Sequence, residues 1–173
     1  MDRAVRIGMI GCGTQAHVHF EGIKELGEDV ATVSAVCDLD DERLSAAAKI
    51  WPAARSAKDY RQLLAPGDLD LAIVATMPNT HEAISLASLE AGANVLCEKP
   101  FMMNANQAQA VLAKAEATGL RIQLGTNMRY MAGSQYLHQL VQGGTFGKPV
   151  YGKAWGCHDY PPVWGPHYHL ATS

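Results

Sequence analysis

Short apolar runs alternate along the chain with longer segments whose apolar residues recur at helical spacing. The runs predict strands over residues 5–10, 30–37, 70–76, 94–97 and 121–124. The segments between them predict helices over residues 14–26, 40–50, 58–65, 79–91 and 104–118. Strands that are apolar throughout, such as 70–76, are typical of a parallel sheet covered by helices on both faces. The pattern therefore predicts a Rossmann-like, doubly wound α/β domain over residues 1–125.

Local signals refine two helix ends. Asn79 and Glu82 fit a capping box, which predicts the start of the helix over 79–91 at Asn79. Gly119 directly follows the fifth helix and predicts its end.

Residues 126–173 follow a different pattern. A helix is expected over 133–142, ended by two glycines. Bulky Tyr151 and Trp155 alternate with small residues over 150–157, which predicts one strand of a second sheet. The rest of this segment offers no partner strand. We interpret 126–173 as a bridging helix and the beginning of an incomplete α+β substrate domain.

Composition excludes several classes of function. Of the 173 residues, 14 are Lys or Arg and 17 are Asp or Glu, a net charge of -3 without the basic stripe that nucleic-acid binding requires. The apolar runs are strand-sized, so no membrane span is expected. The 4 cysteines lack the C-x-x-C spacing of many metal and redox sites and are interpreted as reduced thiols. We expect a cytoplasmic protein without a metal site.

The first strand leads into a glycine-rich turn, whose residues Gly11, Cys12, Gly13, Thr14, Gln15 and Ala16 match the pattern G-x-G-x-x-G/A. Gly11 would permit the tight turn, Gly13 would let a pyrophosphate approach the backbone, and Ala16 would let the helix pack closely on the strand. The following helix would direct its N-terminus at the phosphates. The sequence thus predicts a dinucleotide site, and the alternative is a glycine-rich turn without a ligand.

Asp38 ends the second predicted strand, where a carboxylate can accept hydrogen bonds from both ribose hydroxyls of an adenosine. This favours NAD, because the acidic residues that follow would repel a 2′-phosphate. Arg43 leaves NADP open as a cofactor. The alternative for Asp38 is that it caps the next helix.

Two further strand ends carry polar residues. One supplies Thr76, Asn79 and His81, and the other supplies Glu98 and Lys99. The carboxyl ends of parallel strands meet at the ligand-binding edge of such a sheet. A lysine there could protonate or polarise a carbonyl oxygen, and the alternative is a surface ion pair with Glu98.

These segments also occur in a characteristic order. The Gly11–Ala16 turn, Asp38, the segment from Thr76 to His81, Glu98-Lys99-Pro100, the run 127–130 and Gly147-Lys148-Pro149-Val150 follow one another as in the Gfo/Idh/MocA oxidoreductases. The chain resembles this family from about Val5 to Trp155.

The resemblance implies a cofactor and a reaction. It implies NAD(P) bound at the glycine-rich turn and at Asp38, with the nicotinamide side lined by Thr76, Asn79, His81, Glu98 and Lys99. Asn127 and Arg129 match the bridge between the domains, and His19 matches a histidine that follows the fingerprint. The implied reaction is hydride transfer to or from a sugar, cyclitol or related polyol, with Lys99 as the catalytic residue for proton transfer. Homo-oligomers formed through the second sheet are a further implication.

The sequence also departs from the family. The proline of Thr76-Met77-Pro78-Asn79 comes one place late, and the D-x-x-x-H motif of the second domain does not occur in this chain. We therefore expect the chain to supply mainly the cofactor domain. Two other interpretations stay open: a dinucleotide-binding protein without turnover, and a class I methyltransferase, whose ligand also lies on a glycine turn. Histidines 158, 167 and 169 lack the context of a metal site.

Overall fold

The computed structural model describes residues 3–155. Six strands form one sheet in the order β3-β2-β1-β4-β5-β6, and all neighbouring strands are parallel. The strands are β1 (Val5–Ile10), β2 (Ala31–Cys37), β3 (Arg55–Ala57), β4 (Leu71–Val74), β5 (Asn94–Cys97) and β6 (Ile122–Leu124). The order reverses between β1 and β4, which is the topology of a doubly wound Rossmann-like sheet and confirms the predicted fold class.

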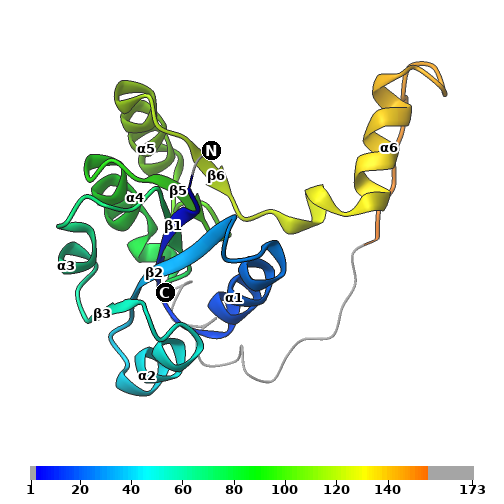
Figure 1. The fold of residues 1–173 in the computed structure, drawn as a ribbon. Coiled ribbons are helices and arrows are strands. Elements are labelled where there is room, and N and C mark those ends of the chain that lie inside the picture. The colour runs from blue at the N-terminus through cyan, green and yellow to red at the C-terminus, as the bar shows by residue number, and fades with distance from the viewer. Residues whose placement is uncertain (1–2, 156–173) are drawn as a thin grey trace. The chain divides into compact units, whose positions relative to one another are not determined.

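Helices cover both faces of the sheet (Figure 1). They are α1 (Thr14–Leu26), α2 (Asp41–Ile50), α3 (Tyr60–Leu64), α4 (His81–Glu90) and α5 (Ala105–Thr118), with the 3-10 turn η1 (Pro78–Thr80) before α4. Each helix crosses from one strand to the next, as parallel strands require.

The core consists of two apolar layers, one on each face of the sheet. Phe20 of α1 and Trp51 after α2 pack with Met9 and Val36 in one layer. Residues of α3, α4 and α5 pack with Val74, Val95 and other strand residues in the opposite layer. Alternate residues of a strand therefore enter different layers, and both are apolar because both faces are covered.

Several helix ends follow the expected local chemistry. The Asp40 side chain accepts hydrogen bonds from the amides of Glu42 and Arg43 and caps α2. Gly119 ends α5 with a φ of 69°, in the left-handed region where glycine carries no steric penalty. The predicted capping box at α4 is wrong: Asn79 lies in η1, and α4 begins at His81 without a side-chain cap. Pro78 begins the turn earlier, because its fixed φ suits a first helical position.

Two strand predictions also differ from the structure. The short edge strand β3 was not expected, because Arg55-Ser56-Ala57 contains no apolar run, and its residues are at most partly buried. The strand expected over 150–157 is absent from 150–155, the part of it that the structure describes. A strand needs a hydrogen-bonded neighbour, and no other described segment of the second unit is a strand.

The chain divides into two compact units, 1–125 and 126–173. The second contains the 3-10 turn η2 (Asn127–Tyr130) and α6 (Ala132–Gln142). Its interpretation as the beginning of a substrate domain stays a prediction. None of the described helices is long and apolar enough to cross a membrane.

Candidate functional site: the carboxyl edge of the sheet

The residues that follow neighbouring strands continue the hydrogen-bond ladder at one edge of the sheet. The amide of Gly11 donates to the Cys37 carbonyl over 2.8 Å, and the amide of Ala75 donates to Ile10 over 2.8 Å. The Glu98 amide likewise donates to the Val74 carbonyl over 2.9 Å, and the Gly125 amide donates to the Cys97 carbonyl over 2.7 Å. These bonds align the segments that carry the predicted site residues.

The glycine-rich turn has the geometry that a dinucleotide needs. Gly11 has a φ of 88°, and a Cβ there would stand 2.5 Å from the Ala75 carbonyl oxygen, so only glycine fits. A Cβ at Gly13 would find Nη1 of Arg43 as its nearest described neighbour, 3.8 Å away. The space beside Gly13 can therefore admit a phosphate.

The start of α1 adds to this fit. Gly13 is the N-cap of α1 and offers no side chain to satisfy the first amides. Thr14 and Gln15 lie in the first turn, and Ala16 is fully buried in the core layer. Uncapped amides at a helix N-terminus attract anions. The turn and helix thus fit a pyrophosphate.

Asp38 is tied to the glycine-rich turn. One of its carboxylate oxygens accepts the Cys12 amide at 2.7 Å, and the other accepts the Asp40 amide at 2.8 Å. The alternative role of Asp38 as a helix cap is wrong, because Asp40 caps α2. Each carboxylate oxygen has lone-pair capacity for a further donor, so Asp38 fits an adenosine diol as well.

His81 lies behind the segment that precedes α4. Its side chain is fully buried, with Nδ1 3.0 Å from the Pro100 carbonyl oxygen and Nε2 3.2 Å from the Thr76 carbonyl oxygen. It therefore joins the end of β4 to the turn after β5. Asn79 is exposed in η1, and Thr76 is half-buried and accepts a hydrogen bond from the Thr80 hydroxyl at 2.8 Å.

Glu98 is a buried carboxylate, 5% exposed. Its Oε1 lies 2.9 Å from His19 Nε2, and its Oε2 accepts the Lys99 amide at 3.1 Å. Burial alone would raise the pKa of Glu98, but hydrogen bonds from His19 and the Lys99 amide hold that pKa below its usual value. The group is thus a carboxylate at neutral pH.

Lys99 follows Glu98 and is exposed at the same edge, and its peptide bond with Pro100 is cis. Asn127 and Arg129 lie in η2 of the second unit and are exposed. Their part in the site stays a prediction.

The sequence does not predict the contact between Glu98 and His19, nor that the Glu98 carboxylate lies beside Gly125. His19 and Glu98 are separated by 79 residues, and no local pattern pairs them. The family resemblance indicates that His19 belongs to the site, but it does not indicate which side chain His19 contacts. Only the sheet topology brings the two side chains together.

Other candidate groups do not enter the site. Burial raises the pKa of Cys12 to about 12 and the pKa of both Cys37 and Cys97 to about 11, so these free thiols are protonated and serve as small apolar filling. Within residues 3–155, no cluster of metal-binding side chains occurs. Cys157 and the histidines at 158, 167 and 169 lie outside the described residues.

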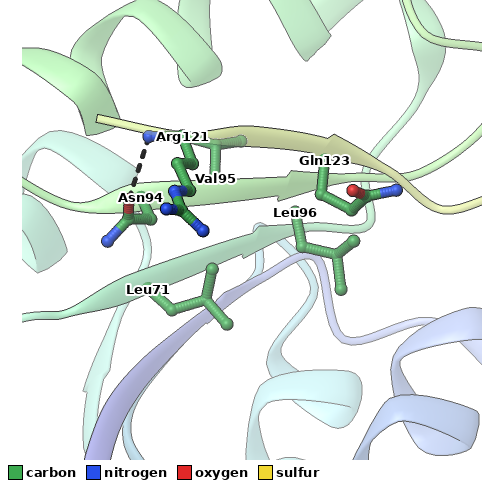
Figure 2. Close-up of a pocket in the computed structure, with 6 residues that line it drawn as sticks. All are labelled: Leu71, Asn94, Val95, Leu96, Arg121 and Gln123. Carbon is green, nitrogen blue, oxygen red and sulfur yellow. Dashed lines mark hydrogen bonds between the residues drawn. The ribbon is translucent and has the colours of Figure 1, made fainter. Parts of the chain in front are cut away.

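A hollow of about 480 Å³ lies on the face of β4, β5 and β6 (Figure 2). It is lined by Leu71, Asn94, Val95, Leu96, Arg121 and Gln123. Leu71 and Asn94 are the first residues of β4 and β5, so the hollow begins at the end of the strands opposite the glycine-rich turn. It is separate from the cofactor edge.

Comparison with known proteins identifies the family of the first unit. Residues 5–126 match the Gfo/Idh/MocA family, described as "Oxidoreductase family, NAD-binding Rossmann fold". A D-apiose dehydrogenase of Paraburkholderia graminis is 29% identical over 145 residues, which cover 84% of this chain and 38% of that protein. An inositol 2-dehydrogenase/D-chiro-inositol 3-dehydrogenase of Shouchella clausii is 33% identical over 150 residues, covering 84% of this chain and 42% of the relative.

A solved structure agrees with the fold. The WlbA dehydrogenase of Bordetella pertussis, in complex with NADH and UDP-GlcNAcA, superposes with a TM-score of 0.80 at 27% identity, covering 86% of this chain and 42% of that one. The chain thus spans less than half the length of these relatives. The methyltransferase and turnover-free alternatives find no support among the comparisons. With its NAD-binding Rossmann fold, the chain belongs to the Gfo/Idh/MocA oxidoreductase family.

Proposed function

We propose that this chain provides the NAD site and the catalytic lysine of a dehydrogenase that acts on a CH–OH carbon of a sugar, cyclitol or related polyol. One observation carries the proposal: the glycine-rich turn, Asp38 and the Glu98-Lys99 turn follow strands that end at the same edge of one sheet. In a doubly wound sheet this edge is the place where dinucleotides bind.

The proposed roles follow the strand order. Gly11, Gly13 and the first amides of α1 hold the pyrophosphate, and Asp38 accepts the ribose hydroxyls on the β2 side. The β4 and β5 ends form the nicotinamide half, where Thr76 and Asn79 line the site and His81 supports it from the core. Asn127 and Arg129 would bridge to the substrate side. When bound, NAD supplies the hydride acceptor or donor.

Lys99 manages the proton in this proposal. During reduction, its ammonium donates a proton to the carbonyl oxygen of the substrate as the carbon is reduced. During oxidation, the lysine amine accepts the hydroxyl proton. The substrate class is supported by the relatives, which act on D-apiose and on inositols by name. NAD is the expected cofactor, and the Asp38 side of the site disfavours the 2′-phosphate of NADP.

Titration of the purified protein with NADH, NADPH and S-adenosylmethionine tests the cofactor first. We expect NADH to bind most tightly and S-adenosylmethionine not to bind. NAD-dependent oxidation of a panel of cyclitols and aldoses then tests the reaction. Lys99→Met should abolish turnover and leave the Kd of NADH within about threefold, since the lost group handles a proton.

Lys49→Met on α2 is the matched control, because Lys49 lies in the last turn of that helix, away from the edge. Binding of NADH without oxidation of any tested polyol would favour the turnover-free interpretation. Failure of NADH to bind would refute the proposed function.

A further inference from the structure

The Glu98 carboxylate fills a space that only glycine leaves open. A Cβ built on Gly125 would stand 2.9 Å from Oε1 of Glu98 and 3.1 Å from its Cδ. Real Cβ atoms essentially never show a separation as short as 2.9 Å, so the carboxylate would have to move, and it is held in place by other bonds. Gly125 has no positive φ, so backbone strain does not require glycine there. Glycine is required at position 125 because any larger side chain would collide with the Glu98 carboxylate.

His19 connects this carboxylate to α1. His19 lies on the helix that starts at the glycine-rich turn, and its side chain is 18% exposed. The bond of 2.9 Å from His19 to Glu98 therefore links the phosphate-binding helix to the end of β5. A hydrogen bond to a buried carboxylate is among the stronger ones in proteins, and loss of one partner leaves the other unsatisfied.

The turn that carries Lys99 is held from both sides. Oε2 of Glu98 accepts the main-chain amide of Lys99. On the other side, Nδ1 of His81 lies 3.0 Å from the Pro100 carbonyl oxygen and 3.3 Å from that of Phe101. Two histidines on different helices thus contact the residues before and after Lys99, and Lys99 itself lies at the exposed position between them.

We propose that Glu98 and His19 form a buried positioning pair that fixes the turn carrying Lys99 in the nicotinamide half of the site, and that Gly125 is required to make room for it. The inference rests on the proposed function. It also revises the expected role of Glu98: the carboxylate is 5% exposed and both of its oxygens bind groups of the protein, so its role is to orient the turn.

Gly125→Ala tests this without removing a polar group. The added methyl should displace the Glu98 carboxylate and loosen the Lys99 turn. We expect the Kd of NADH to rise by at least about fivefold, because the main chain of the turn, which Lys99→Met leaves in place, borders the nicotinamide half in this proposal. The Kd of ADP should stay within about twofold, because ADP occupies only the β1–β3 half of the site. General destabilisation would weaken both ligands alike.

Gly22→Ala is the matched control. Gly22 lies on α1, and a Cβ there would meet no described atom within 4 Å. Both Kd values should be unchanged in this variant. His19→Ala should reproduce the selective loss of NADH affinity, and Glu98→Gln should retain most of the affinity, because its amide oxygen can still accept the Lys99 amide.

A double-mutant cycle identifies the route of the effect. If Gly125→Ala acts by displacing Glu98, it should have no further effect on NADH affinity in a Glu98→Ala background. Additive losses would overturn the inference, as would equal losses for ADP and NADH or unchanged NADH affinity in Gly125→Ala and His19→Ala. Failure of the unchanged protein to bind NADH and ADP would instead refute the proposed function itself.

Discussion

The main-chain amide of Cys12 donates a hydrogen bond of 2.7 Å to the side chain of Asp38. Cys12 stands between the two glycines of the turn after β1, and Asp38 follows β2, so one carboxylate fixes the spacing of the two segments that would hold the pyrophosphate and the adenosine ribose. Its second oxygen accepts the Asp40 amide. Asp38 thus shapes its own site before any ligand binds, which lowers the ordering cost of binding.

Replacement of Asp38 should therefore lower the affinity for NADH and also weaken the preference for NADH over NADPH. We expect Asp38→Ala to raise the Kd of NADH by about tenfold or more, because the ribose diol loses its acceptor and the turn loses its tether. The Kd of NADPH should rise less, because the repulsion of its 2′-phosphate is also removed. Fluorescence titration with both cofactors measures the difference.

Asp29→Ala is the control for this change, because Asp29 is exposed in the turn between α1 and β2. Equal losses for NADH and NADPH would contradict the assignment of Asp38 to the ribose.

Gly11→Ala should unfold the domain more easily. The new methyl would meet the Ala75 carbonyl 2.5 Å away, and the residue would have to keep a φ of 88°. We expect the free energy of unfolding in urea to fall by about 2–4 kcal/mol, because neither the backbone of β4 nor that of the turn can move cheaply. Gly22→Ala, in the exposed interior of α1, should instead stabilise by about 0.5–1 kcal/mol. A neutral Gly11→Ala would mean that the turn can rearrange.

The sequence was sufficient where a single element determines the outcome. The apolar runs predict β1 and β5 with their observed bounds, Gly119 ends α5 as predicted, and the turn at Gly11 stands where the fingerprint predicts it. Each of these depends on neighbours within a few residues, where spacing, cap chemistry and glycine geometry act directly.

Contacts between distant segments could not be predicted. The bonds of Glu98 with His19, and of His81 with Pro100, exist because β1, β4 and β5 lie side by side, and no pattern in any of them signals the pairing. At α4 the error came from a local signal. Asn79 fits a capping box, but the fixed backbone of Pro78 starts a 3-10 turn one residue earlier, so Asn79 lies inside that turn. The apolar pattern does not predict the edge strand β3, because backbone pairing with β2 does not require an apolar run.

The buried thiols should be unreactive in the folded protein. Burial raises the pKa of Cys12 to about 12 and the pKa of Cys37 and Cys97 to about 11, so at pH 8 hardly any thiolate forms. Alkylation by iodoacetamide, followed by mass spectrometry of peptides, should be at least about 100-fold slower at these three residues than in urea. Rapid labelling of Cys12 in the native protein would show that the glycine-rich turn opens.

Asp70 should make the free energy of unfolding depend on pH in the acid range. It binds the side chains of Arg3 and Arg6 and the Arg6 amide. The hydrogen bond from Arg3 is the main cause that holds the pKa of Asp70 well below its usual value, against the opposing effect of burial. A carboxylate with a depressed pKa in the folded state stabilises the fold at every pH above its unfolded pKa of about 3.9. That stabilisation is lost as the pH falls below about 4 and through the lower folded value.

Asp70→Asn should therefore lower the free energy of unfolding by about 1 kcal/mol at pH 7, a modest value because both arginines are partly exposed and solvent screens the pairs. The difference from the unchanged protein should shrink steadily as the pH falls from about 4 to 2, because the aspartate of the unfolded chain takes up a proton there while the folded carboxylate keeps its charge to lower pH. Urea unfolding across this range measures it, with Asp29→Asn as the exposed control. If the difference were the same at pH 7 and pH 2, loss of hydrogen-bond geometry would explain the effect, and the charge of Asp70 would not.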